Sequence, residues 1–165
     1  MIRTRERYKI FLDSESNFKI LSISNIIDEN KYYAFLQDKK NQSNLTQFLF
    51  TSKLTINLLL EILKLSDIDI TRIRLFDDDD ETAHTVLDIF KDYKNKKIDE
   101  KVVHNNLDYL DDDYSIDIRS FRLFSNNNHG MLQVYVNGIF ETMDSNYWNN
   151  ILLKALETVW NEENI

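Results

Sequence analysis

The sequence predicts an α+β protein in which a mainly antiparallel sheet of about six to seven strands is packed by three to four helices. Three observations lead to this class: short segments of alternating apolar residues, polar turns between them, and a long amphipathic helix near the C-terminal end. No segment rich in proline, glycine or serine divides the 165 residues. We therefore expect a single α+β domain over residues 1–165.

The N-terminal part of the chain favours strands. Apolar residues alternate on both sides of a polar, turn-like segment within 8–22, which predicts a β-hairpin. Aromatic residues near the two ends of the segment 33–50 predict a second pair of strands around a polar connection. The residues that follow are apolar on most sides of a helix, so we expect a buried helix from its cap, Ser52, to about Leu65.

Two segments in the middle of the chain form an echo. Residues 68–76 read IDITRIRLF and residues 116–124 read IDIRSFRLF, so six of nine positions are identical. In both segments the alternation of apolar and polar residues shifts by one position after the third residue, which indicates a β-bulge. We interpret them as two strands of one sheet that share a pattern; a true internal duplication is the alternative. Between them, apolar residues at helical spacing predict one helix over 83–93 and a shorter one over 99–110.

The C-terminal part of the chain predicts a hairpin and a helix. The polar loop 125–130 leads into an apolar segment at 131–137, as expected for the second strand of a hairpin. Apolar residues then recur at helical spacing over 148–160. We expect this amphipathic helix to be capped by Asp144 or Ser145 and to pack across the sheet.

The composition excludes several classes of protein. The chain has no cysteine, no proline and two glycines, so it lacks thiolate chemistry and a glycine-rich phosphate loop. Its 28 acidic residues against 20 basic ones give a net charge of −8, which disfavours direct contact with nucleic acid. Neither a secretory signal nor an apolar stretch of the ~20 residues that a bilayer requires is present. We therefore expect a cytoplasmic protein that does not bind membranes.

The first candidate site is a run of acidic residues at the start of the helix predicted over 83–93. Carboxylates in the first turn of a helix complement its positive end, so capping alone explains such a run. The alternative is a surface that binds a basic partner. The run consists of Asp77, Asp78, Asp79, Asp80 and Glu81.

The second candidate site follows the helix predicted over 99–110. Acidic residues there lie at the negative end of the helix, where the dipole disfavours them. Turn formation, a basic partner or a bound cation would each explain their position. Flanking tyrosines favour a protein interface, because tyrosine adds contact area and a polar tip. The residues are Asp111, Asp112 and Asp113, flanked by Tyr109 and Tyr114.

The motifs give no sign of catalysis. The three histidines are not at the spacing of metal ligands, and no nucleophile motif is present. We expect a binding protein, not an enzyme, with no metal or cofactor. The leading hypothesis is an acidic inhibitor of a basic protein, most concretely a bacterial toxin immunity protein that neutralises a nuclease-type toxin. Both acid runs and the two tyrosines would form its partner-binding surface, and its oligomeric state is left open.

Three other functions fit the same residues less directly. A phage-encoded anti-defence protein, similar in action to an anti-CRISPR, would block a nucleic-acid-binding channel with the same acidic surface. A metal-dependent hydrolase or nuclease would use clustered aspartates to hold a divalent ion. A structural or assembly subunit needs no site at all. The partner of an inhibitor would be a basic protein, whose identity the sequence leaves open.

Overall fold

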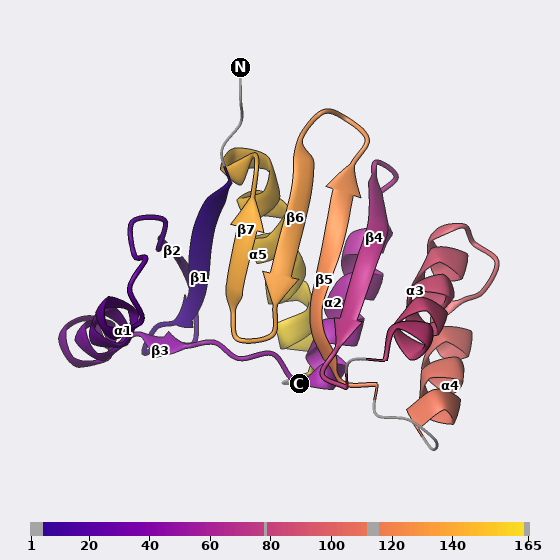
Figure 1. Ribbon diagram of the computed structural model, residues 1–165, viewed down its shortest axis with the longest axis horizontal. Coiled ribbons are helices and arrows are strands. Elements are labelled where there is room, and N and C mark those ends of the chain that lie inside the picture. The colour runs from indigo at the N-terminus through magenta and orange to yellow at the C-terminus, as the bar shows by residue number, and fades with distance from the viewer. Residues whose placement is uncertain (1–4, 78, 112–115, 164–165) are drawn as a thin grey trace.

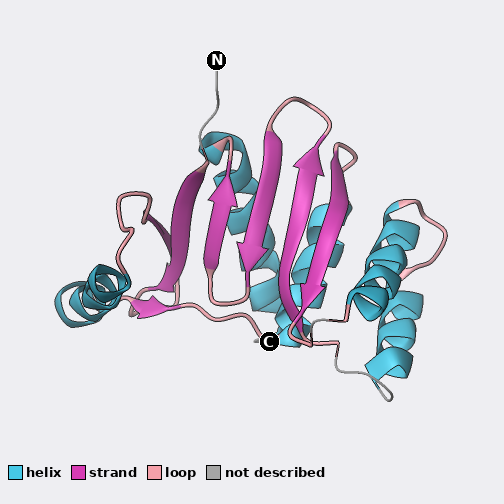
Figure 2. Ribbon diagram, viewed as in Figure 1, coloured by secondary structure: helices cyan, strands magenta, loops and turns pink. Residues whose placement is uncertain are grey.

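The computed structural model describes residues 5–77, 79–111 and 116–163. Within these ranges one seven-stranded antiparallel sheet is accompanied by five helices (Figures 1 and 2). The strands are β1 (Glu6–Leu12), β2 (Phe18–Ser22), β3 (Thr46–Gln47), β4 (Ile68–Leu75), β5 (Ile118–Ser125), β6 (Gly130–Tyr135) and β7 (Ile139–Thr142). The helices are α1 (Glu29–Ser43), α2 (Ser52–Leu63), α3 (Asp80–Lys94), α4 (Glu100–Asp111) and α5 (Ser145–Glu163). The predicted α+β class is confirmed.

The strand order places the first strand, β1, beside the last strand, β7. The order across the sheet is β2-β1-β7-β6-β5-β4, and β3 pairs with β1 beside this path. The predicted N-terminal hairpin is present as β1 and β2, with Ile10 opposite Ile20. β1 pairs on its other side with β7, where Tyr8 lies opposite Phe140. β4 therefore forms the outer edge at the far end of the sheet.

The hydrophobic core lies on one face of the sheet, beneath α2 and α5 (Figure 1). Trp148 and Leu152 of α5 are completely buried there, as are Leu58 and Leu59 of α2. Both helices fall on predicted segments, and α5 packs across the sheet as expected. Asp144 caps α5, because its carboxylate accepts a hydrogen bond from the backbone N–H of Tyr147 at 3.3 Å.

The predicted cap of α2 is wrong by one residue. Ser52 is the first residue of the helix, and the side chain of Thr51 accepts the capping hydrogen bond from the N–H of Leu54 at 3.1 Å. Thr51 has an extended backbone, which aims its hydroxyl at the first turn. The Ser52 hydroxyl instead donates to the carboxylate of Asp117, 2.7 Å away.

The predicted strand pair within 33–50 is also wrong. Most of this segment is the helix α1, and only Thr46 and Gln47 form a short strand. Local signals decide the outcome: the Asp28 carboxylate caps the first turn, and Asn44 ends the helix in the left-handed conformation at φ 52°. None of the residues of α1 is buried, so the helix lacks the apolar stripe by which a helix is predicted.

The echo segments are adjacent, antiparallel strands. β4 pairs with β5, and Ile73 lies opposite Phe121, which occupies the same position in the second copy of the echo. The register shifts at Thr71 in one strand and at Arg119 in the other, which is the fourth residue of each copy. Both predicted bulges are thus present. The two copies are related by a local twofold axis that passes between Ile73 and Phe121.

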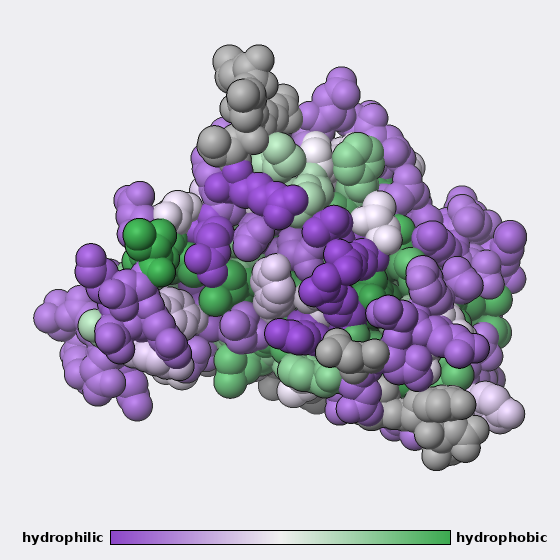
Figure 3. Space-filling view, viewed as in Figure 1, coloured by the Kyte–Doolittle hydropathy of each residue, from purple (hydrophilic) through white to green (hydrophobic). Residues whose placement is uncertain are grey.

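The face of the sheet opposite α2 and α5 is turned toward the viewer in Figure 1, and no described helix covers it over β4, β5 and β6. Hydrophilic side chains dominate this open face in the space-filling view (Figure 3). A row of polar residues crosses five strands here, each residue directly opposite the next. The row runs Arg72, Arg122, Gln133, Glu141 and Arg7.

Candidate functional site

The two acid runs belong to a helical hairpin beside the edge strand β4. α3 packs against β4, and α4 packs antiparallel to α3 after the short connection 95–99 (Figure 1). Val86 and Phe90 of α3 and Val103 and Leu107 of α4 are buried and hold the hairpin together. Because the helices are antiparallel, the first turn of α3 and the last turn of α4 lie at the same end of the hairpin.

The first acid run contains one residue with a clear structural role. Asp79 caps α3: its carboxylate accepts hydrogen bonds from the N–H groups of Glu81 and Thr82 and from the Thr82 hydroxyl. The hydrogen bonds from Thr82 hold the pKa of Asp79 below its usual value. Asp77, Asp80 and Glu81 are exposed around this cap. Asp78 lies outside the described residues.

The second acid run begins at the last residue of α4. Asp111 is exposed there, and the side chain of Tyr109 is 73% exposed on the same turn. Asp108, which the sequence analysis did not select, is exposed one turn before Asp111. Three predicted site residues lie outside the described residues: Asp112, Asp113 and Tyr114.

The hairpin therefore brings together acids from both runs that are about 30 residues apart in the sequence. We call this surface the acidic end of the hairpin. It has no basic residue in the first turn of α3 or the last turn of α4, whereas the last turn of α3, at the opposite end, carries Lys91 and Lys94. The described acids of the acidic end are Asp77, Asp79, Asp80, Glu81, Asp108 and Asp111.

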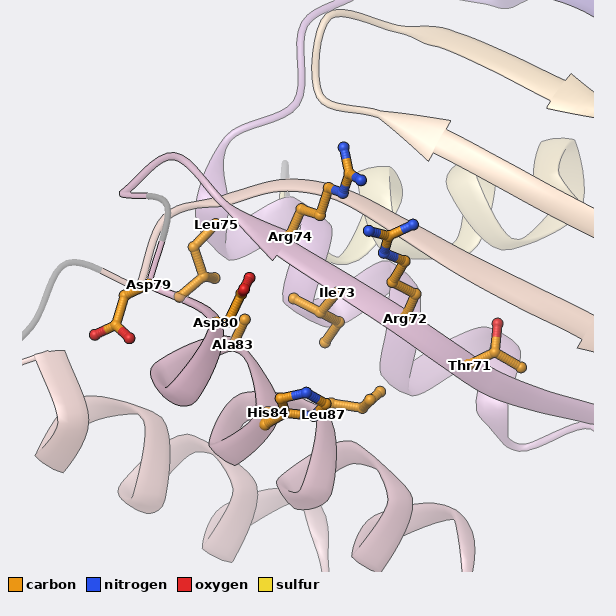
Figure 4. A pocket seen from close by; sticks show the side chains of 10 residues that line it. All are labelled: Thr71, Arg72, Ile73, Arg74, Leu75, Asp79, Asp80, Ala83, His84 and Leu87. Atoms are coloured by element: carbon orange, nitrogen blue, oxygen red, sulfur yellow. The ribbon is translucent and has the colours of Figure 1, made fainter.

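A groove adjoins the acidic end. It has a volume of about 640 Å³ and separates residues 71–75 of β4 from one side of α3 (Figure 4). Asp79, Asp80 and His84 line it from the helix, and Arg72 and Arg74 line it from the strand. The groove thus carries opposite charges on its two walls. Among the described strands, β4 pairs with β5 alone, so part of its backbone faces this groove without a partner from them.

A second polar cluster, which the sequence analysis did not identify, connects the β5–β6 turn to the start of α5. Nδ1 of His129 lies 2.8 Å from a carboxylate oxygen of Asp144, and its ring stacks on Tyr147 with centroids 3.7 Å apart. The Tyr147 hydroxyl donates to the carboxylate of Asp67, and Trp148 donates to the backbone carbonyl of His129. This cluster fixes the turn against the helix. Its members are distant in sequence, and Asp144 alone was selected from the sequence, as a candidate cap of the C-terminal helix.

Metal coordination was one explanation of the acid runs. Within the described ranges, no three histidine, aspartate or glutamate side chains come close enough together to hold a metal ion. His84 is exposed on α3, and His104 is partly buried on α4. Asp78, Asp112 and Asp113 of the two runs lie outside these ranges.

Fold and site together define an α+β protein with a single antiparallel sheet and an acidic helical hairpin at its edge. No family model matches the chain, and no match was found among curated proteins or solved structures. Among the described helices, none is both long enough and apolar enough to cross a membrane.

Proposed function

We propose that this chain is an acidic, cytoplasmic protein that binds and inhibits a basic protein, most concretely as a bacterial immunity protein that neutralises a nuclease-type toxin. One observation carries the proposal: the described acids of the two runs, at the start of α3 and in the last turn of α4, lie at the same end of the hairpin. Charges on one small surface create a stronger local field than the same charges spread over the molecule. A cationic active site that normally binds phosphates would be attracted to this surface.

The hairpin suits this role because it is held rigidly. Val86 and Phe90 anchor α3 in the core, and the hydrogen bonds of Asp79 fix its first turn. A rigid surface loses little conformational entropy when a partner binds. Tyr109, 73% exposed beside the carboxylates, would supply apolar contact area at the centre of the interface. The protein would act by occupying the partner's site, without catalysis or a cofactor.

Association kinetics test the proposal. A basic protein captured from the native host at low salt is identified, purified and mixed with wild-type chain and with a variant whose acidic end is neutralised. Electrostatic steering accelerates association roughly 10-fold or more, so the variant should associate at least about tenfold more slowly, while wild-type association slows steeply with added salt. The variant combines Asp77→Asn, Asp80→Asn, Glu81→Gln and Asp111→Asn; Asp79 is kept because it caps α3.

A matched control removes the same number of charges elsewhere. Its net charge equals that of the first variant, so only the location of the lost carboxylates differs. Equal slowing in both variants, or association that is insensitive to salt, would contradict the proposal. The control combines Glu15→Gln, Asp38→Asn, Glu157→Gln and Glu162→Gln, all at exposed positions.

A phage-encoded anti-defence protein would use the same surface in the same way. Its partner would be an effector with a nucleic-acid-binding channel instead of a toxin. The identity of the captured protein separates these two versions of the proposal, because the charge arrangement favours both equally.

A further inference from the structure

The arginines of this chain are gathered on one side of the sheet. The sequence contains seven arginines, and the six among the described residues lie on β4, β5 and β1 or immediately before β1. The thirteen lysines are spread over helices, loops and the strands β1 and β2. We use the name arginine face for the part of the open face over β4 and β5 (Figure 3). Its arginines are Arg72, Arg74, Arg119 and Arg122.

The arginine face gathers positive charge. Within it, Nε of Arg122 donates a hydrogen bond to the side-chain oxygen of Gln133, 2.8 Å away. Arg72 lies directly opposite Arg122 on the neighbouring strand, and like charges in this position destabilise a sheet. None of the four arginines forms an ion pair with a described carboxylate, although the chain has 28 acidic residues. By contrast, Arg7 lies 3.7 Å from Glu141 on the same open face. An anionic ligand would supply the close ion pairs that these arginines do not form with the described acids, including Asp79 and Asp80 across the groove.

Two exposed aromatic rings accompany these arginines. Each copy of the echo ends in Arg-Leu-Phe, with the leucine buried beneath the sheet and the phenylalanine exposed. The phenylalanines, Phe76 and Phe124, are 57% and 44% exposed. Because alternate residues of a strand point to the same face, the ring of Phe124 lies on the same side as Arg122. Phe76 follows directly after the end of β4, where its N–H donates to the backbone carbonyl of Asp117 at 3.0 Å. Figure 4 shows Arg72 and Arg74 extending from the same side of β4.

The local twofold axis arranges these groups in a line. Phe124 lies opposite Asp69 near the start of β4, the arginines follow, and Phe76 comes just after the end of β4. The seven residue steps from Asp69 to Phe76 span roughly 23 Å at about 3.3 Å per residue. The result is a central group of cations with an aromatic ring at each end. Asp69, which lies opposite Phe124, accepts a hydrogen bond from Asn126 at 2.8 Å.

We infer that the arginine face binds a single-stranded nucleic acid. Such a ligand alternates phosphates, which guanidinium groups bind, with bases that stack on exposed rings. A duplex hides its bases and cannot use the two phenylalanines, and an acidic peptide has carboxylates but no bases. The sequence-based expectation of no contact with nucleic acid rested on the net charge of the whole chain, −8. The arginines instead create a positive field on one face, which attracts phosphates locally. This inference does not depend on the function proposed for the acidic end.

Fluorescence anisotropy with the full chain and a labelled oligothymidine of about ten nucleotides tests the inference. Binding should be measurable at about 50 mM salt and should weaken toward about 200 mM. In the double variant Arg72→Gln/Arg74→Gln, the slope of log affinity against log salt should fall by roughly 1.4, since each phosphate contact on a single strand contributes about 0.7. Phe124→Ala should lower the affinity by at least about fivefold at constant charge.

The matched control is the double variant Lys53→Gln/Lys101→Gln. It removes the same charge from exposed sites on α2 and α4, and its affinity for the oligonucleotide should equal that of the wild type. Thermal unfolding shows whether each variant is folded, and loss of Arg72 should leave stability unchanged or higher because it faces Arg122.

Four outcomes would overturn the inference. The wild type could fail to bind the oligonucleotide at low salt, or the lysine control could lose as much affinity as the arginine variant. A duplex of equal length could bind as tightly as the single strand, which would make the rings irrelevant. Polyglutamate of the same charge could compete as well as the oligonucleotide, which would assign the face to an acidic protein instead.

Discussion

The side chain of Lys9 donates a hydrogen bond to the backbone carbonyl of Asn137, within the turn that joins β6 to β7. Lys9 is completely buried, and burial lowers the pKa of its ammonium group to about 8. The unfolded chain keeps this proton to a pH of about 10.4. Between these two pH values the unfolded state binds the proton and the folded state does not, so the free energy of unfolding rises with pH.

The first prediction follows from this difference. Between about pH 7 and pH 10 the wild type should gain roughly 3 kcal/mol of stability from Lys9, at about 1.4 kcal/mol for each unit of pKa difference. Lys9→Met should lack this gain, because its side chain does not titrate. Urea unfolding at both pH values measures the effect. Parallel pH dependence in the two proteins would contradict it.

The second prediction concerns Gly138, in the same turn. Its φ of 86° is in the left-handed region, and a Cβ atom there would lie 2.2 Å from the backbone oxygen of Phe48. Gly138→Ala should therefore destabilise the protein by about 2–4 kcal/mol in urea unfolding. Gly130→Ala is the control: its φ is also positive, but the nearest atom is a side-chain atom of Met143 at 3.1 Å, so a smaller loss is expected. Equal losses would show that the Phe48 contact is unimportant.

The third prediction separates the structural acid of the first run from its neighbours. Asp79→Ala removes the cap of α3 and should lower the midpoint of thermal unfolding at pH 7. Asp80→Asn, at an exposed site in the first turn, should have a smaller effect. Because hydrogen bonds lower the pKa of Asp79, its stabilising effect is present at neutral pH and is lost as the pH falls through that lowered pKa. The two variants should thus become similar in strong acid.

The fourth prediction concerns Tyr147 and Asp67. The hydroxyl of Tyr147 donates to the Asp67 carboxylate and is the main reason that the pKa of Asp67 is lowered. Tyr147→Phe should destabilise the protein by about 1 kcal/mol at pH 7, the usual effect of one hydrogen bond. The difference should shrink as acid protonates Asp67, since a lowered pKa stabilises the fold only while the carboxylate is charged. Urea unfolding at neutral and acidic pH tests this, and a constant difference would argue against it.

Most helices and strands could be predicted because the apolar residues that face the core recur at the spacing of a strand or of a helix. α3, α4 and α5 each carry an apolar stripe. The bulges at Thr71 and Arg119 were predicted because the alternation of apolar residues shifts by one position there. α1 could not be predicted in this way, because its residues face solvent and leave no stripe. The residues that indicate this helix in the sequence are its caps, Asp28 at the start and Asn44 at the end. The alternating aromatic residues Tyr33 and Phe35 wrongly suggested a strand.

The candidate site was only partly predictable. The acid runs are continuous in sequence, so their composition was evident. That Glu81 and Asp111 lie at the same end of the hairpin depends on the antiparallel packing of α3 and α4. Within the first run, the sequence does not reveal that Asp79 alone serves as the cap. The arginine face was missed because Arg72 and Arg122 are 50 residues apart and meet only through strand pairing.

The pairing of β1 with β7 has a consequence for how this protein is made. β1 is synthesised before β7, and 136 positions separate Glu6 from its partner Thr142. Until β7 has been made, the nascent hairpin of β1 and β2 therefore has an inner edge without its final neighbour. That open edge exposes the hairpin to pairing with strands of other chains.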